Sequence, residues 1–506
     1  MNKNLIFPAI LLLSLACSKI DDAPDDSRAG LLATTKPVDP FEIHNILSAF
    51  RSLQERDTSV NDFDIKPNHI YVRFMPRNES ELEQLRSDTT IVLFDYPLNT
   101  EDNDSIINPV SSFSESGIQY QYSVLPIDKK IPSVRYEILY EVFLPPSDNI
   151  TKKNASDNFF EKLVNESARL TGNISEFDTI KSARSSKKRW SPGGRVRVWD
   201  DFLNMYIPVC HVNVHARWFT HIESALTDDE GYFRMSSFTH AVNYSIKWEN
   251  SRFTIRDGLF FQAWYNGPKM KGDWFLDIIG GKSKMFATIH RAAYRQFYGD
   301  NLGLFRPTLN SGGRTKICYM DGDGTGVFKG DFSGGGLLPD IKIWGSNSTK
   351  PSNFIFACAT HELGHQAHSQ YIGNFRYIKV SQIIKESWAE AVEWAITNDE
   401  YHKLGQKYGN RSAIGYDHQF GKHAEWPLVP DRNYSPAFID LIDDFNQGEA
   451  FGKEYPDDKI SQYTILYLNR YILPSSTDIN SLREELIKHK PEGVDDDSIR
   501  DLYLLY

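Results

Sequence analysis

Residues 361–365 read His-Glu-Leu-Gly-His, and no other short pattern constrains the chain as strongly. On an α-helix the two histidines lie one turn apart on the same face. Two imidazoles in that arrangement can bind one Zn²⁺, with Glu362 placed to accept a proton from a bound water. A helix is expected because Ser352 or Asn353 can cap its start and Gly373 follows its last turn.

A catalytic zinc site needs a third protein ligand besides His361 and His365. Glu386, Glu390 and Glu393 fall on one stripe of a second expected helix, where three like charges would repel one another. A nearby cation and imidazole N–H donors would remove that conflict. We therefore expect Glu386 to be the third ligand of a single Zn²⁺ and Glu390 to accept a hydrogen bond from a ligand histidine. The alternative is a solvated acidic face beside an ordinary amphipathic helix.

This combination of motif, third glutamate and further acid resembles the gluzincins, the thermolysin-like zinc peptidases. The resemblance implies zinc-dependent hydrolysis of peptide bonds, with the ion bound by His361, His365 and Glu386. It implies that Glu362 is the general base and that an acid four residues after the third ligand orients a histidine. The residue before the third ligand is Lys385, where the family often has Asn. The resemblance covers these two helices and their surroundings, not the whole chain.

The rival metzincin class continues as His-x-x-Gly-x-x-His after the second histidine, and this chain has His368 and Tyr371 at the last two positions. His368 is too far along the helix from His361 to bind the same ion. It is expected to be a hydrogen-bonded surface residue, or else to act beside the substrate or behind a ligand. Cys358, one turn before His361, is expected to be a small buried residue rather than a thiolate ligand.

Hydrolysis at such a centre also needs a hydrogen-bond donor for the oxyanion. The resemblance implies that a Tyr or His after the third ligand supplies it. The candidates are Tyr416, His418, His423 and Tyr434. Peptide substrates often add a strand to an exposed sheet edge. Residues 341–344 are expected to form that edge, because Pro339 suits an edge strand.

The N-terminus contains a basic start, an apolar run from Leu5 to Leu15, and then Ala16-Cys17. This pattern indicates a secretory signal, and the apolar run is too short to span a bilayer. Residues 14–17 resemble a bacterial lipobox, which implies that Cys17 is lipidated and that its acyl chains anchor the protein to a membrane. A cleaved, unlipidated signal is the alternative.

The acidic stretch at residues 18–26 is expected to be a disordered tether. It resembles the tethers that send lipoproteins to the cell surface in Bacteroidetes-like bacteria. An outer-membrane lipoprotein at the cell surface is therefore expected, with a periplasm-facing one as the alternative. The net charge of −11 argues against a nucleic-acid partner. After Cys17 the chain has Cys210, Cys318 and Cys358, so at most one disulfide can form.

The chain is long enough for several domains. We expect a signal peptide over residues 1–16, a tether and N-terminal segment over 17–62, an α+β accessory domain over 63–190, a β-sandwich over 191–265 and a metallopeptidase domain over 266–506. The fold class is thus multidomain α+β, with a gluzincin-like catalytic domain whose C-terminal lobe is mainly helical. The accessory domain faintly resembles inhibitor-like or propeptide-like modules of secreted proteases. Auto-inhibition is one hypothesis for it, and a passive spacer is the other.

Local patterns place the expected elements. Strands are expected near residues 64–75, 90–95 and 136–143, and helices over 80–86, 157–170, 436–445 and 459–471. A further helix is expected to start at Ser283 and to bury Met285, Phe286 and Ile289. Residues 227–233 lie among short strands and resemble part of the transthyretin-like regulatory domain found beside carboxypeptidases. Residues 321–326 begin like a calcium loop, but the twelfth position is Phe332 instead of Glu, so a glycine-rich turn is expected.

Together these patterns favour a zinc endopeptidase of the bacterial cell envelope that acts on proteins or peptides. The alternative is a catalytically inactive, peptidase-like surface lipoprotein that binds protein or glycoprotein. The intact Glu362 disfavours that alternative, because a protein that only binds would not need the general base.

Overall fold

The structure, a computed structural model, describes most of the chain from Val38 onward. The described residues are 38–56, 63–88, 90–98, 117–145, 155–174, 189–259, 261–309, 313–322, 326–328, 339–345, 350–405, 435–453, 455–504 and 506. The expected signal peptide, the lipidation site Cys17 and the acidic tether lie outside these residues. The structure is mixed α and β, 36% helical and 25% strand, with several sheets, which confirms the expected α+β class at that level.

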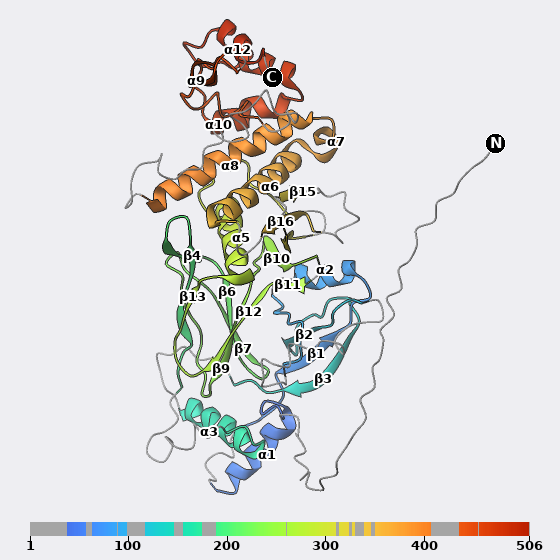
Figure 1. Cartoon of the computed structure of the whole chain (residues 1–506). Helices are drawn as coiled ribbons and strands as arrows, with labels where there is room; N and C mark the ends of the chain where they lie inside the picture. The colour runs from blue at the N-terminus through green and yellow to red at the C-terminus, as the bar shows by residue number, and fades with distance from the viewer. Residues whose placement is uncertain are drawn as a thin grey trace, which may run out of the picture. The chain divides into compact units, whose positions relative to one another are not determined.

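The first sheet has three antiparallel strands in the order β2-β1-β3. These strands are β1 (His69–Phe74), β2 (Gln121–Pro126) and β3 (Tyr136–Val142). The helices of this part are α1 (Ile43–Gln54), α2 (Glu79–Ser87) and α3 (Ala155–Leu170), and α1 packs on α3 (Figure 1). The strand expected over residues 90–95 is only an isolated bridge, because Phe94 alone exchanges backbone hydrogen bonds with Tyr122.

Two four-stranded sheets follow. One has the order β12-β9-β6-β7, and the other has the order β13-β4-β5 with β8 also paired to β4. Their strands are β4 (Gly193–Asp200), β5 (Met205–Pro208), β6 (Asn213–Trp218), β7 (His221–Leu226), β8 (Tyr232–Arg234), β9 (Val242–Lys247), β12 (Trp264–Met270) and β13 (Trp274–Ile278). The Trp274 ring lies 5.2 Å from that of Tyr244 and 5.8 Å from that of Tyr265, so aromatic contacts join the two sheets.

The last sheet has five strands in the order β11-β10-β14-β16-β15. They are β10 (Phe253–Asp257), β11 (Phe261–Gln262), β14 (Thr315–Asp321), β15 (Gly326–Phe328) and β16 (Ile341–Gly345). The expected domain boundary between residues 265 and 266 does not separate this sheet from the previous two. β10 and β11 precede that boundary but belong to the five-stranded sheet, whereas β13 follows it and pairs with β4. The buried run Phe253–Arg256 suits a strand that is covered on both faces.

The expected edge strand at residues 341–344 is an interior strand, so that prediction is wrong. β16 pairs with β14 on one side and with β15 on the other. Pro339 precedes the first strand residue, so its missing N–H removes no ladder bond and does not force an edge. The edge strand on this side is β15.

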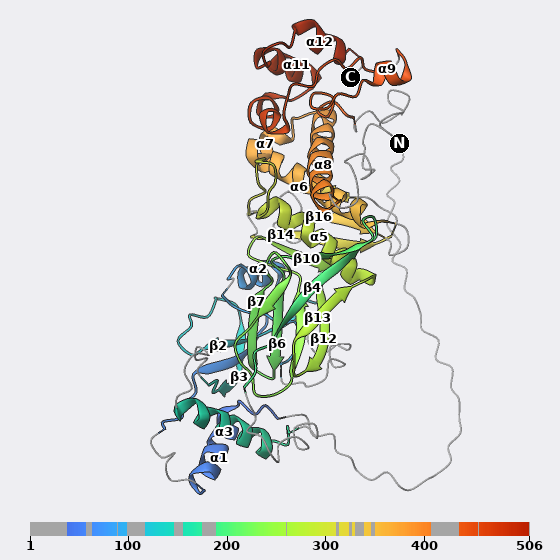
Figure 2. The same ribbon diagram turned by 90° about the vertical axis from the view of Figure 1, so that its left-hand side faces the viewer.

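Helices α5 (Gly281–Phe297) and α6 (Ser352–Ile372) pack on this sheet and on each other, and α8 (Gln382–Gly405) packs on α6. Figure 1 shows α6 and α8 running alongside each other, and Figure 2 shows both of them above the sheets. α5 buries Met285, Phe286 and Ile289 as expected, but it starts after Gly280 and not at Ser283. α6 ends at Gly373, whose φ of +85° is a conformation that favours glycine.

The start of α6 is held by a side chain distant in sequence. Pro351 occupies the cap position, so neither Ser352 nor Asn353 caps the helix. Instead, Asp201 Oδ1 accepts hydrogen bonds from the Ser352 backbone N–H, at 2.8 Å, and from the Ser352 hydroxyl. The neighbouring Asp200 is fully buried and accepts hydrogen bonds from Arg291 of α5 and from Tyr401 of α8. These two aspartates, at the end of β4, therefore contact three helices.

The C-terminal part differs from expectation in detail. Residues 437–442 form turns instead of a helix, and the helix expected over 459–471 begins only at Ile465. Its elements are α9 (Gln447–Phe451), α10 (Ile465–Tyr467) with a π-helical continuation over Leu468–Ile472, α11 (Ile479–Lys488) and α12 (Asp496–Leu502). The Tyr463 N–H bonds to the Leu441 carbonyl, which keeps this segment extended. None of the described helices is long and apolar enough to cross a bilayer.

Candidate metal centre

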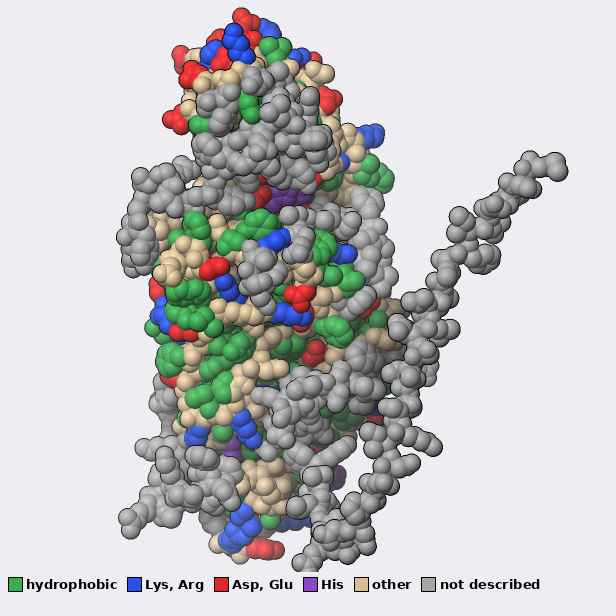
Figure 3. Space-filling view, in the orientation of Figure 1, with side chains coloured by type: hydrophobic (Ala, Val, Ile, Leu, Met, Phe, Trp, Pro, Cys, Tyr) green, Lys and Arg blue, Asp and Glu red, His purple; other side chains and the backbone are tan. Residues whose placement is uncertain are grey.

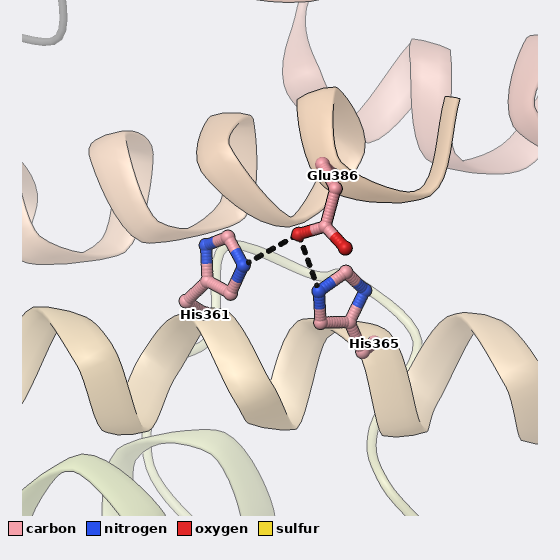
Figure 4. Close-up of side chains that lie close together, drawn as sticks. All are labelled: His361, His365 and Glu386. Atoms are coloured by element: carbon pink, nitrogen blue, oxygen red, sulfur yellow. Dashed lines mark hydrogen bonds and ion pairs between the residues drawn. The ribbon is translucent and has the colours of Figure 1, made fainter. Parts of the chain in front are cut away.

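The contact between α6 and α8 brings His361, His365 and Glu386 together (Figure 4). Glu386 Oε2 lies 3.3 Å from Nε2 of His361 and 3.1 Å from Nε2 of His365. Gly364 lies between the histidines in sequence, and a Cβ there would come within 3.3 Å of Val392 on α8. The absence of a side chain at Gly364 thus lets the two helices approach closely.

The distances from Glu386 Oε2 to the two imidazole nitrogens are compatible with a shared zinc ion. Zinc bonds of about 2.0–2.2 Å in a tetrahedral arrangement place neighbouring ligand atoms roughly 3.3–3.5 Å apart. The two measured separations, 3.3 and 3.1 Å, are close to that range. Among the described residues, a second group able to hold a cation consists of His361, Glu390 and Glu393, which shares one histidine with the first.

The outer nitrogens of both imidazoles are also held. His361 Nδ1 lies 2.9 Å from Oε2 of Glu393 but 4.0 Å from Oε1 of Glu390. The closer partner of His361 Nδ1 is therefore Glu393 and not the expected Glu390. Glu393 lies two turns after Glu386 on α8, and that part of α8 lies beside the part of α6 that carries His361. Sequence reasoning placed Glu393 on the right stripe of α8 but gave it no role.

Two further supporting residues were not anticipated. The Tyr377 hydroxyl, at the end of α7 (Asn374–Tyr377), lies 3.1 Å from Nδ1 of His365. The Gln382 amide donates a hydrogen bond to Oε1 of Glu386, which leaves Oε2 directed at the histidines. Tyr377 comes from a short helix after the turn at Gly373, and no sequence pattern singles it out. Gln382 is one turn before Glu386 on the same helix, and this i, i+4 spacing is a signal that sequence reasoning could have used.

The site concentrates negative charge in a buried place. Glu362, Glu386, Glu390 and Glu393 are each at most 6% exposed. Burial alone would raise the pKa of Glu386, but hydrogen bonds from His361 and His365 hold that pKa well below its usual range. Burial lowers the pKa of His361, but hydrogen bonds to Glu386 and Glu393 raise it well above its usual value. Buried carboxylates in this number require compensating positive charge, which a divalent cation would supply.

His368 is not the surface histidine that was expected. Its side chain is 1% exposed, and neither ring nitrogen has a hydrogen-bond partner among the described residues. Burial lowers its pKa to about 3, so the ring is neutral. The ring meets that of Tyr377 edge-on at 5.2 Å and so packs against the residue that bonds His365. Cys358 is buried, as expected, and burial raises its pKa well above the usual value, which keeps it a thiol.

Several predicted residues cannot be placed in this site. The four candidate oxyanion donors lie outside the described residues: Tyr416, His418, His423 and Tyr434. The same is true of residues 323–325 and Phe332 in the segment that begins like a calcium loop. On the face shown in Figure 3, histidine and acidic side chains reach the surface at the level of α6 and α8.

Comparison with the profiles of known protein families, with curated protein sequences and with solved structures finds no match to this chain.

Proposed function

We propose that this protein is a gluzincin-like zinc metallopeptidase that hydrolyses peptide bonds in proteins or peptides. One observation carries the proposal: the Nε2 atoms of His361 and His365, on one helix, both lie within 3.3 Å of Oε2 of Glu386, on the helix packed against it. The motif glutamate Glu362 stands next to the first of these histidines and is 5% exposed.

In this proposal, different side chains bind the metal and transfer the proton. A zinc ion bound by His361, His365 and Glu386 would supply Lewis acidity that polarises the scissile carbonyl and lowers the pKa of water. Glu362 would take a proton from the attacking water and pass it to the leaving amine. Glu393 and Tyr377 support this role because each holds the Nδ1 of one ligand histidine, which leaves its Nε2 free to bind the metal.

The position of the sheet edge supports a peptide as the substrate. Among the described residues, β15 is the terminal strand of the five-stranded sheet, and it lies against α6, the helix that carries the motif. Its backbone pairs with β16 on one side. An extended peptide added to the other side would run past α6, with its main chain held by strand hydrogen bonds. This edge replaces residues 341–344 in the proposed substrate site.

The cellular setting is part of the same proposal and depends on the N-terminal sequence. The basic start, the short apolar run and the lipobox-like Ala16-Cys17 support an outer-membrane lipoprotein at the cell surface. It is likewise a proposal that the sheets belong to a gluzincin-like catalytic unit, a transthyretin-like β-sandwich and an α+β accessory domain.

The test uses the soluble protein without residues 1–17, purified and loaded with zinc. We expect about one zinc per chain by mass spectrometry and cleavage of a quenched peptide library. Glu386→Ala should lose the zinc, whereas Glu362→Gln should keep the zinc and lose peptide hydrolysis by at least about 100-fold. Undiminished turnover in Glu362→Gln, or no zinc in the wild type after reconstitution, would overturn the proposal.

A further inference from the structure

The short helix α7, which follows the turn at Gly373, presents apolar side chains to the surface. Phe375 is 87% exposed, more than any other large hydrophobic side chain among the described residues. Ile378 comes three residues later, on the same side of the helical turn, and is 57% exposed. Tyr371, in the last turn of α6, is 48% exposed. Neighbouring exposed apolar side chains of this kind mark a site of interaction.

α7 is held in place, so its apolar side chains have a fixed position. The Tyr377 backbone N–H donates to the Gly373 carbonyl oxygen at 2.9 Å. The Ile378 N–H donates to the Asn374 carbonyl oxygen at 3.0 Å. The Tyr377 hydroxyl also lies 3.1 Å from Nδ1 of the proposed ligand His365. Turning the apolar side of α7 inward would therefore break a contact behind the candidate metal centre.

The charged side chains around this helix are all positive. Residues 363–385 contain Arg376, Lys379 and Lys385 but no Asp or Glu, in a chain whose net charge is −11. Arg376 and Lys379 are exposed, and within the described ranges no carboxylate forms an ion pair with either. Lys385 Nζ lies 4.9 Å from the centroid of the Tyr377 ring. Positive charge is thus concentrated beside Phe375, although the chain as a whole is acidic. Hydrophobic and basic side chains are visible at the level of α7 in Figure 3.

We propose that α7 inserts Phe375 and Ile378 into the interface of an anionic membrane and places Arg376 and Lys379 on the phosphate headgroups. Exposed aromatic and aliphatic side chains enter the boundary between headgroups and acyl chains, and adjacent Lys and Arg add attraction to anionic lipids. A protein partner fits less well, because a stable protein interface covers about 800 Å² on each side. α7 has four residues, and its most exposed side chain protrudes instead of lining a groove.

This membrane contact goes beyond the proposed hydrolysis and does not depend on zinc. The proposed lipid anchor at Cys17 would keep the chain beside a membrane, so a weak contact made by a few side chains suffices. Tyr377 lies between Arg376 and Ile378 and contacts His365. Insertion of α7 would therefore place the candidate metal centre beside the membrane surface.

The experiment measures vesicle binding by cosedimentation, with protein that lacks residues 1–17 so that no acyl anchor contributes. The vesicles are either phosphatidylglycerol mixed with phosphatidylethanolamine, or phosphatidylcholine alone. We expect saturable binding to the anionic vesicles that weakens as salt is added, and binding at least about tenfold weaker to the neutral ones. Phe375→Ser should keep the Tm and lower the affinity for anionic vesicles by roughly tenfold. Phe375→Trp should retain the affinity, because Trp also favours the membrane interface.

Matched variants separate this site from general adhesion to lipid. Phe275→Ser changes another exposed phenylalanine, on β13, and should leave the affinity unchanged. Arg376→Gln combined with Lys379→Gln should lower the affinity by roughly tenfold. Lys488→Gln combined with Lys490→Gln removes the same charge from two lysines that are paired with carboxylates, and it should have little effect.

The proposal is overturned if the wild type does not bind anionic vesicles, or if Phe275→Ser weakens binding as much as Phe375→Ser does. Equal binding to both kinds of vesicle at low salt would also overturn it. If the α7 variants change the binding of acidic peptides while the wild type ignores vesicles, α7 contacts a protein partner instead and the proposal is wrong. Each measurement is repeated after the zinc is removed with a chelator. Vesicle binding should persist, so failure of the membrane contact and failure of the zinc centre are distinguishable.

Discussion

Glu393 Oε2 lies 2.9 Å from Nδ1 of His361, and this carboxylate, rather than that of Glu390, is the outer partner of the first proposed ligand. Such partners fix the ring orientation and increase the basicity of the ligand. We predict that Glu393→Gln lowers zinc affinity by about 10–100-fold, measured by competition with a chromophoric chelator. Glu390→Gln is the matched control and should cost less; a larger loss in Glu390→Gln would contradict the assignment.

The Tyr377 hydroxyl should also affect zinc affinity, through its contact with His365. Tyr377→Phe removes only the oxygen that bonds Nδ1 of His365, and it retains the ring that packs on His368. We predict roughly tenfold weaker zinc binding with little change in Tm of the zinc-free protein. Tyr371→Phe, at a position 48% exposed, serves as the control. Equal zinc affinities in the two variants would show that the hydrogen bond does not position His365.

Glu83 should be essential for stability. This α2 residue is 8% exposed and lies within 3.2–3.3 Å of charged nitrogens of Arg86, Arg256 and Lys316. Burial acts to raise the pKa of Glu83, but these cations, Arg86 foremost, lower it below its usual value. Removing the carboxylate takes away a buried negative charge that these three buried cations share. We predict that Glu83→Ala lowers the free energy of unfolding by about 3–5 kcal/mol.

The comparison for Glu83 is Glu81→Ala on the same helix. Glu81 pairs with Arg77, whose side chain is 76% exposed, and its loss should cost less than about 1 kcal/mol. Urea unfolding followed by tryptophan fluorescence measures both variants. Similar losses in the two would mean that the network of Glu83 contributes little. The network links α2 to β10 through Arg256 and to β14 through Lys316, so the same comparison measures how firmly the accessory segment is attached to the five-stranded sheet.

His290 predicts a pH dependence of stability. Its side chain is fully buried, its Nε2 lies 2.9 Å from the Cys210 carbonyl oxygen, and burial lowers its pKa from 6.5 to about 4. Between these values the unfolded chain binds a proton that the folded chain does not. Stability therefore falls as the pH drops from about 6.5 to about 4, by up to about 1.4 kcal/mol per pH unit from this group. His290→Gln should remove that contribution, so unfolding curves of the two proteins measured at several pH values should converge toward low pH. Parallel profiles would show that His290 does not titrate in this way.

The parts of the site that follow from one helix could be predicted from sequence. His361 and His365 share a face because of the helical repeat, and the like charges of Glu386, Glu390 and Glu393 indicated a second helix facing a cation. The choice between Glu390 and Glu393 depends on how far α8 is shifted along α6. That shift is set by packing between the helices, including the contact of Gly364 with Val392. It cannot be predicted from the local periodicity of the sequence.

The failures at the level of the fold have the same origin. Residues 341–344 were correctly expected to be a strand, but strand order depends on long-range pairing, so its place between β14 and β15 was missed. Residues 436–445 have a helical pattern, yet Asp440 is buried in hydrogen bonds to Gln447 and Tyr506, and the chain turns there instead. His368 was expected at the surface because polar residues usually are, and only the tertiary structure shows it enclosed beside Tyr377.

The adjacent aspartates at the end of β4 also bear on how this protein can be engineered. Asp201 caps the helix that carries both histidines, and Asp200 holds the neighbouring helices through Arg291 and Tyr401. A shortened catalytic fragment beginning at residue 266 would lack both of them, together with a central strand of its own sheet. A unit that keeps these contacts therefore begins no later than β4, so the sheet of β4 is internal scaffolding of the candidate metal site rather than a detachable appendage.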